Sequence, residues 1–466
     1  MENYFPVNYP EMIVEKSNGL TTSEKKLISL GYDTFLRLWS YPNPYKMQQG
    51  GKELCDLLVV FENNIIIFSD KECAYGKSGN DEVDWRRWYK KAIKKSANQL
   101  LGAKAWIEKY PDKISLDAKG EKPFPIRIRI TPETQFHLIS ISHGASTSCK
   151  EFFSGGDGGL IINSSIIGEM HTDKKCEPFQ IGIVEEDIRN FIHIFDDISY
   201  ATVLKELDTI EDFTNYLNER KKLLFNQKIL AAGENELLSQ HISGLIDNNK
   251  TVLSDLCQSN YSEIIFEAGQ WEELISSTRY IKWRKRLRKS YFWDVLLQKT
   301  FFFIENGLSA VTTCPDLNDQ SILFQRLAKQ NRLQRLALSE SFLSFFASVP
   351  PGFRGTRIMF NKDESDLCFL LFLLPRKSYM SDENYRRVRR EMLYDYCAIA
   401  KTDFPQFPFV IGVAHESSDT DYGSEDFVLL DSSNWTDEDF SAALQTKHEY
   451  QAIGLLKERT IFQKIF

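Results

Sequence analysis

The sequence lacks several features that would assign it to a specialised class of protein. Its 466 residues contain no uninterrupted run of about 18 apolar residues, which excludes a membrane-spanning helix. The eight cysteines include no Cys-x-x-Cys pair, which argues against a zinc knuckle or a thioredoxin-like pair. Residues 1–5 lack the basic-then-apolar order of a secretory signal. We therefore expect a cytoplasmic protein with reduced thiols and no membrane partner.

The composition is that of an ordinary globular protein, with 42% apolar and 26% charged residues. A chain of this length is expected to form two or three domains. The net charge is −8, so the field of the whole molecule would repel phosphate. Any affinity for nucleic acid must therefore come from local basic surfaces.

The apolar patterns predict an α/β protein in three parts. Residues 1–185 form the first part, residues 186–350 a mainly helical region, and residues 351–466 a small α/β module that begins after Pro350-Pro351-Gly352. In the first part we expect helices over 22–39 and 85–108, and strands over 54–61, 65–69, 126–130, 136–142 and 179–184. In the last module we expect strands over 367–374, 409–413 and 427–430, and a helix over 381–400. The glycine run at 154–159 lacks the Gly-Lys-Ser/Thr ending of a phosphate-binding loop and predicts a turn.

The strands at 54–61 and 65–69 form the hairpin that carries the candidate chemistry. A two-residue turn at Asn63-Asn64 would set Asp56 opposite Lys71. Because side chains alternate between faces, Asp56, Ser69 and Lys71 are expected on one face. A carboxylate there can bind Mg²⁺ or Mn²⁺, and a neighbouring lysine can offset charge in the transition state of phosphodiester hydrolysis. The simpler alternative is a cross-strand ion pair at the end of the sheet.

These strands resemble the PD-(D/E)xK, or restriction-endonuclease-like, nuclease superfamily. The segments GKELCDLLVV (51–60) and IIIFSDK (65–71) are similar to its pattern of an aspartate on one strand and acid-x-Lys on the next. The resemblance covers roughly residues 20–145 and implies a mixed sheet flanked by helices. It also implies that Asp56 is the metal-binding aspartate, Lys71 the lysine and Gln99 the glutamine of the following helix.

The sequence departs from the superfamily pattern at the second acid. Ser69 stands two residues before the lysine, and the carboxylate comes one residue later, at Asp70. A β-bulge at 69–70 would turn Asp70 onto the metal face. Glu24, from the preceding helix, is another candidate for the second acid, and a third possibility is that the site no longer cuts. His143, after a predicted strand, is interpreted as a loop histidine.

Two basic clusters are candidates for nucleic-acid binding. The first lies on the helix after the hairpin and comprises Arg86, Arg87, Lys90, Lys91, Lys94 and Lys95. The second is interleaved with aromatic residues and comprises Lys282, Arg284, Lys285 and Arg286. Each cluster could instead be a solvated helix face.

The sequence therefore predicts a Mg²⁺- or Mn²⁺-dependent nuclease that cleaves nucleic acid, with Asp56, Ser69, Asp70, Lys71 and Gln99 as catalytic candidates and Asp56, Asp70 and Glu24 as metal ligands. DNA is favoured because most members of the superfamily cut DNA, and the resemblance implies a restriction, repair or phage-defence setting. The alternative is a catalytically inactive nuclease-fold protein that acts as a nucleic-acid-binding or scaffolding subunit. A homodimer or a partner subunit would suit cleavage of both strands of a duplex.

Overall fold

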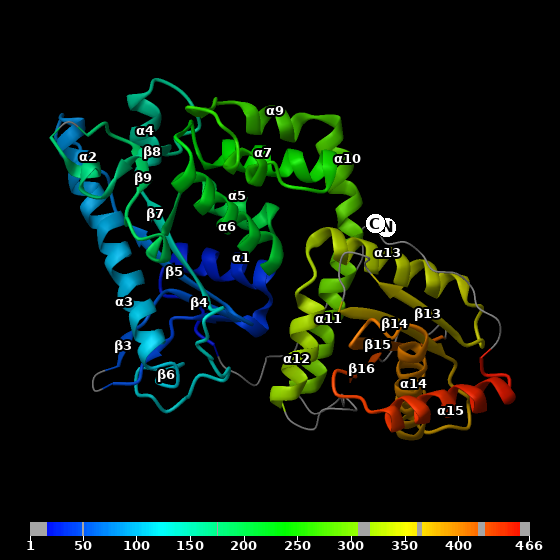
Figure 1. The fold of residues 1–466 in the computed structure, drawn as a ribbon. Coiled ribbons are helices and arrows are strands. Elements are labelled where there is room, and N and C mark those ends of the chain that lie inside the picture. The colour runs from blue at the N-terminus through cyan, green and yellow to red at the C-terminus, as the bar shows by residue number, and fades with distance from the viewer. Residues whose placement is uncertain are drawn as a thin grey trace. The chain divides into compact units, whose positions relative to one another are not determined.

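A computed structural model describes residues 16–48, 51–174, 176–305, 317–360, 366–417 and 425–456. The described residues up to Arg286 form one compact unit, and those from Leu287 onward form a second (Figure 1). The boundaries expected at 185 and 350 lie inside these units rather than between them. In the described part of the chain, no helix combines the length and apolarity needed to cross a membrane.

A mixed five-stranded sheet organises the first unit, with the strand order β1-β4-β5-β7-β10. Its strands are β1 (Ser40–Pro42), β4 (Leu57–Phe61), β5 (Asn64–Glu72), β7 (Gln135–His143) and β10 (Ile192–Asp196). The β1, β4 and β5 strands pair antiparallel, whereas β7 pairs parallel with both β5 and β10. The β10 strand lies in the stretch that we expected to be helical, and its pairing with β7 extends this sheet beyond residue 185.

Helix α1 (Thr22–Trp39) covers one face of this sheet and begins where the sequence predicts. The side chain of its N-cap residue, Thr21, accepts a hydrogen bond from the amide of Glu24 at 3.1 Å. The opposite face carries α2 (Asp81–Tyr89), the π-helical segment η1 (Lys90–Lys94) and α3 (Lys95–Lys109). This helix begins before the expected residue 85 because the Asn80 side chain caps the amide of Val83 at 3.0 Å.

The alternation of side chains along β4 and β5 separates two apolar cores. Leu58 and Ile67 belong to the core formed with the buried tryptophans of α2 and the apolar residues of α3. On the other face Phe68 packs with Phe35 of α1, their ring centroids 6.0 Å apart. A side chain of β5 at an odd-numbered position therefore faces α3, and one at an even-numbered position faces α1.

The hairpin turn lies one residue earlier than we expected. Phe61 pairs with Asn64, so Glu62 and Asn63 form the turn, and Glu62 adopts a positive φ of 50°. Leu57 consequently pairs with Phe68, and the expected pairing of Asp56 with Lys71 is wrong by two positions. Because the error is an even number of residues, the faces on which the side chains lie are unchanged.

The first unit contains a second sheet, with the order β12-β11-β8-β9, and a small sheet with the order β3-β2-β6. The remaining strands are β2 (Tyr45–Lys46), β3 (Lys52–Glu53), β6 (Ile114–Ser115), β8 (Ile161–Ile167), β9 (Gln180–Ile183), β11 (Ile229–Ala231) and β12 (Ile264–Phe266). The helices are α4 (Ser146–Phe152), η2 (Gly168–Thr172), η3 (Ile188–Asn190), α5 (Ser199–Glu206), α6 (Ile210–Asn226), α7 (Glu234–Asn248), α8 (Leu253–Cys257), α9 (Gln270–Ser276) and α10 (Thr278–Leu287). Residues 126–130, which are all described, form no strand, so that prediction was wrong.

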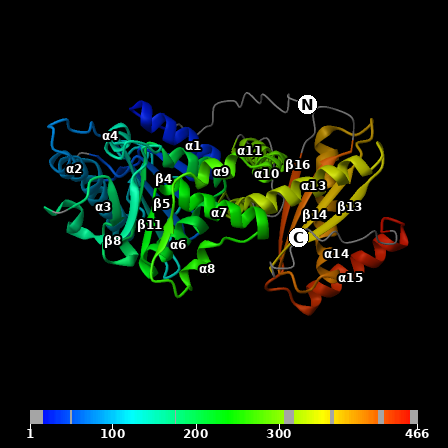
Figure 2. The same cartoon turned by 90° about the horizontal axis from the view of Figure 1, so that it is seen from above.

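The second unit contains a four-stranded sheet with the order β13-β14-β15-β16. Its elements are η4 (Arg288–Ser290), α11 (Tyr291–Glu305), α12 (Leu317–Ala328), α13 (Arg332–Ser348), β13 (Gly355–Phe360), β14 (Leu367–Leu374), α14 (Asp382–Asp403), β15 (Phe409–Glu416), β16 (Glu425–Asp431) and α15 (Asp437–Ala452). Helix α14 packs on one face and α15 packs against α14 (Figure 2). The ring of Trp293 in α11 meets Phe369 on the other face. The predicted strands and helix of this module are confirmed, whereas β13 and α15 were missed.

Candidate active site

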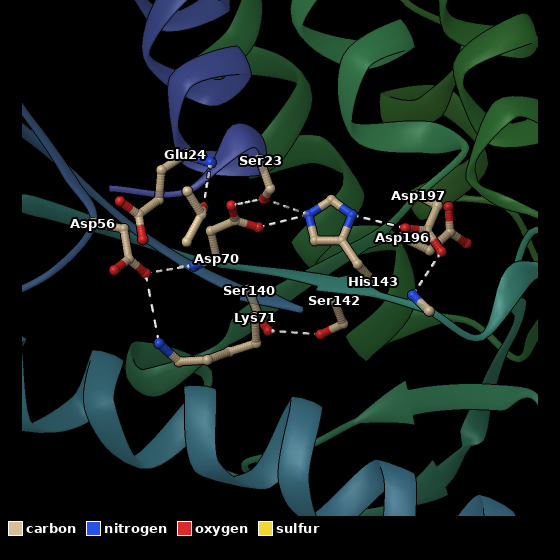
Figure 3. A network of polar contacts seen from close by, with 12 residues as sticks. Ser23, Glu24, Asp56, Asp70, Lys71, Ser140, Ser142, His143, Asp196 and Asp197 are labelled. Carbon is tan, nitrogen blue, oxygen red and sulfur yellow. Dashed lines mark hydrogen bonds and ion pairs between the residues drawn. The ribbon is translucent and has the colours of Figure 1, made fainter. Parts of the chain in front are cut away.

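Asp56 and Lys71 meet on the face of the central sheet that α3 covers. Asp56 immediately precedes β4, and its Oδ2 lies 3.8 Å from Nζ of Lys71, near the end of β5 (Figure 3). On the same face of β5, the hydroxyl of Ser69 donates a hydrogen bond of 3.4 Å to Oε1 of Gln99 on α3. The structure therefore gathers on one face the four residues that the sequence pattern singles out there.

The carboxyl group of Asp56 is buried, with 5% of the residue exposed. Burial raises its pKa to about 7, although Lys71 and the amide of Asp70 favour the charged form. That amide donates a hydrogen bond of 2.5 Å to Oδ2 of Asp56. A carboxylate whose charge is compensated only in part is a group that a bound cation would stabilise.

Asp70 lies on the other face of the sheet. The β5 strand pairs with β7 in unbroken register from Asn64 to Glu72, so the bulge considered at 69–70 does not form. The Asp70 carboxylate accepts a hydrogen bond from Ser23 on α1, and its Oδ1 lies 2.6 Å from Nε2 of His143. The expectation that Asp70 joins Asp56 as a metal ligand or catalytic group is therefore wrong.

His143 is the last residue of β7 rather than a loop residue, and it bridges two carboxylates. Its Nδ1 lies 2.7 Å from Oδ1 of Asp197, and the Asp197 carboxylate also accepts the amide of Gly144 at 2.9 Å. Burial would lower the pKa of His143, but the hydrogen bonds to Asp197 and Asp70 outweigh burial and raise it to about 9. Burial likewise disfavours the charged form of Asp197, yet the contacts with His143 and Gly144 lower its pKa. The bridging histidine is therefore an imidazolium at neutral pH.

Two buried serines of β7 lie beside Ser69 and Lys71 on the same face of the sheet, and the sequence analysis missed them. Ser140 is the register partner of Ser69, and Ser142 is the partner of Lys71. Their hydroxyl oxygens lie 3.2 Å apart. In the sequence they stand in an apolar strand, where an alternation of serine with isoleucine indicates a polar face only once the neighbouring strand is known.

Glu24 is the remaining carboxylate named by the sequence. Its Oε2 accepts the amide of Leu20 at 2.7 Å, and in Figure 3 its side chain extends from the start of α1 toward Asp56. Among the described residues, no group of three or more His, Cys, Asp or Glu side chains is arranged to hold a metal ion. Mg²⁺, however, is commonly held by one or two carboxylates together with water and substrate phosphates. The hard oxygen donor of Asp56 suits such a substrate-completed site rather than an all-protein cage, and Glu24 is the candidate for a second donor from α1.

The basic cluster beside this site lies on α2, η1 and α3. Its exposed members are Arg87, Lys90, Lys91 and Lys95, whereas Arg86 and Lys94 are half-buried. Lys94 pairs with Glu169 at 3.4 Å. In the π-helical turn the amide of Lys95 donates to the carbonyl of Lys90, so Lys90 and Lys95 lie on the same side of the helix. Gln99, one α-helical turn after Lys95, lies on that side as well.

The second basic cluster lies on α10 and is partly neutralised. Nη1 of Arg284 lies 3.6 Å from Glu206 of α5, and that carboxylate also accepts the hydroxyl of Tyr280 at 2.8 Å. Lys282, Lys285 and Arg286 are exposed. Tyr280 and Arg284 therefore attach this helix to α5, while the exposed cations leave its predicted role in nucleic-acid binding a prediction.

Comparison with known proteins adds no assignment: no family model, no curated protein and no solved structure matches this chain.

Proposed function

We propose that this chain is a metal-dependent nuclease that hydrolyses phosphodiester bonds of nucleic acid. The observation that carries the proposal is the placement of a buried carboxylate, Asp56, 3.8 Å from the ammonium of Lys71. The exposed cations of α2, η1 and α3 support it, because a phosphate backbone is positioned by such side chains. DNA is the favoured substrate through the resemblance to the PD-(D/E)xK superfamily.

Each residue of the site has a role in this proposal. Asp56 and Glu24 would hold Mg²⁺ or Mn²⁺, which when bound polarises the phosphoryl oxygen and lowers the pKa of water. The Lys71 ammonium orients the attacking water and offsets the charge that develops on the phosphate. Gln99 and Ser69 form a polar pair at 3.4 Å that fixes the α3 side of the site.

One observation favours a second candidate, a nuclease-fold protein that binds nucleic acid without cutting it. The position of the second acid is Ser69, and the adjacent carboxylate of Asp70 is bound to His143 on the other face. With Asp56 as the single acid of the hairpin on this face, metal affinity would depend on Glu24. In this candidate the basic cluster of α2, η1 and α3 keeps its role and the hydrolysis is lost.

Incubation of the full chain with supercoiled plasmid and Mg²⁺ or Mn²⁺ tests the proposal. We expect nicked or linear DNA with the unaltered chain, none with EDTA, and none with Lys71→Ala or Asp56→Asn. Lys150→Ala, which removes an exposed lysine of α4, is the matched control and should cut normally. Metal-dependent cutting that survives Lys71→Ala would reject this site, and DNA binding without cutting would favour the second candidate.

A further inference from the structure

Asp70 belongs to two sets of contacts at once. Through its main chain it donates a hydrogen bond of 2.5 Å to Oδ2 of Asp56, on the α3 face. Through its side chain it contacts Ser23 and His143, on the α1 face. The residues that bind the Asp70 carboxylate, Ser23 and His143, therefore also fix the position of the Asp70 amide that binds Asp56.

The same side-chain cluster reaches the second candidate carboxylate. Ser23 directly precedes Glu24 in the first turn of α1, and its hydroxyl lies 3.2 Å from Nε2 of His143. The start of α1 and the end of β5 are thus joined through one imidazole ring. Glu24 belongs to α1, and Asp56, which precedes β4, is held to the end of β5 by the amide of Asp70. The ring is therefore linked to the elements that position both carboxylates.

The imidazole ring of His143 is also held on the side opposite Asp70. Asp197, in the turn between β10 and α5, binds Nδ1 at 2.7 Å and the amide of Gly144 at 2.9 Å. The ring of Tyr200 packs edge-on to His143, with centroids 5.4 Å apart. With 14% of its side chain exposed, His143 has little freedom to turn away from Asp70.

We propose that His143 is a positioning residue of the nuclease site: by holding Asp70 and Ser23 it keeps Asp56 and Glu24 in the positions from which they bind the metal. The proposal rests on the proposed function. Histidine serves it better than an amide because its two ring nitrogens donate in opposite directions to two carboxylates. The geometry of metal-binding side chains is commonly maintained by partners of this kind that never touch the metal.

Three substitutions separate positioning from bulk stability. His143→Gln sets an amide near the place of Nε2 and keeps a donor for Asp70, whereas His143→Asn keeps a donor for Asp197 instead. His143→Phe retains the ring and removes both donors. The matched control is His241→Gln on α7, which removes another buried histidine, bound to Thr251 at 3.0 Å and lying 3.4 Å from Glu219.

Four quantities are measured for each variant: the affinity for Mn²⁺ alone by calorimetry, kcat and KM on plasmid, the Tm, and hydrogen exchange of the peptide that covers β5. We expect His143→Phe and His143→Asn to lower the Mn²⁺ affinity and kcat by about 10- to 100-fold with KM unchanged. His143→Gln should recover part of both, although its Tm resembles that of His143→Asn. The β5 peptide should exchange faster in the Phe and Asn variants and at the original rate in the control.

The outcomes distinguish this proposal from the proposed function. If the unaltered chain does not cut nucleic acid, the proposed function fails, and Mn²⁺ affinity and exchange still decide the role of His143. Losses of affinity and kcat that follow Tm alone, with no recovery in His143→Gln, would overturn the positioning role. An exchange rate of β5 that is unchanged in His143→Phe would overturn it as well.

Discussion

The amide of Asp70 donates a 2.5 Å hydrogen bond to the carboxylate of Asp56, while the carboxylates of the two residues occupy opposite faces of the sheet. The two acids that the sequence places in one site are thus related through a main-chain contact instead of a shared ligand. Asp56 faces Lys71 and α3, and Asp70 faces His143 and α1. The two carboxyl groups therefore have opposite electrostatic surroundings, and their variants should behave differently.

Replacement of Asp56 by Asn should stabilise the protein above pH 7. The folded-state pKa of about 7 is higher than the ordinary 3.8, so the folded state holds a proton that the unfolded state releases between these values. The unfolding free energy therefore falls as pH rises toward 7. Above pH 7 the full cost of burying the ionised Asp56 carboxylate applies. We expect Asp56→Asn to gain about 2–4 kcal/mol at pH 8 and almost nothing at pH 4, as measured by urea unfolding. An equal gain at both pH values would contradict the assignment.

The imidazolium of His143 should stabilise the protein with the opposite pH dependence. Its pKa is raised from 6.5 to about 9, so its contribution is complete below pH 6.5 and is lost as pH rises through 9. We expect the difference in unfolding free energy between the unaltered chain and His143→Gln to shrink by about 3 kcal/mol between pH 6.5 and pH 10. Because both proteins share the same lysines and tyrosines, the contributions of those residues to the pH dependence cancel in this difference in unfolding free energy. A difference that stays constant over this range would show that the histidine is neutral in the fold.

Local patterns predicted α1, β4 and β5 because each carries its own signal. The capping pair Thr21 and Glu24 marks the start of α1, and the runs of Leu, Val and Ile mark the strands. The register was misjudged because Asn63-Asn64 is the better turn by residue preference, yet Glu62 accepts the positive φ. Since side-chain direction has a period of two, the face of Asp56 and Lys71 was still correct.

The network around His143 could not be predicted from local patterns. His143 and Asp197 are 54 positions apart, and Ser23 and His143 are 120 apart. Only the parallel pairing of β10 with β7 brings the turn that carries Asp197 to the end of β7. That pairing was hidden because β10 is a five-residue strand inside a helical pattern.

The two basic clusters should differ in their effect on nucleic-acid binding. Substitution by alanine of Arg87, Lys90, Lys91 or Lys95 should weaken duplex DNA binding. The slope of log Kobs against log salt should become shallower by about 0.9 for each phosphate that the protein no longer neutralises. Lys282→Ala and Lys285→Ala on α10 serve as matched controls and should leave the slope unchanged. Fluorescence anisotropy over a salt series measures both the affinity for duplex DNA and its salt slope. A smaller slope with the α10 variants alone would move the binding surface to that helix.

The identity of the second acid should be decided by a set of substitutions at two positions. If Glu24 completes the site, Glu24→Gln should abolish metal-dependent cutting, and Ser69→Ala should retain most of it because the hydroxyl makes a single 3.4 Å contact with Gln99. Ser69→Asp places a carboxylate at the position where the superfamily pattern has one. It would sit on the same buried face as Asp56, so we expect it to raise the pKa of Asp56 further and to lower stability. Mn²⁺ affinity and plasmid cleavage at pH 8 measure these effects. Cleavage that appears only in Ser69→Asp, with none by the unaltered chain or by Glu24→Gln, would show that the chain has lost its second acid and that the non-cutting candidate describes it.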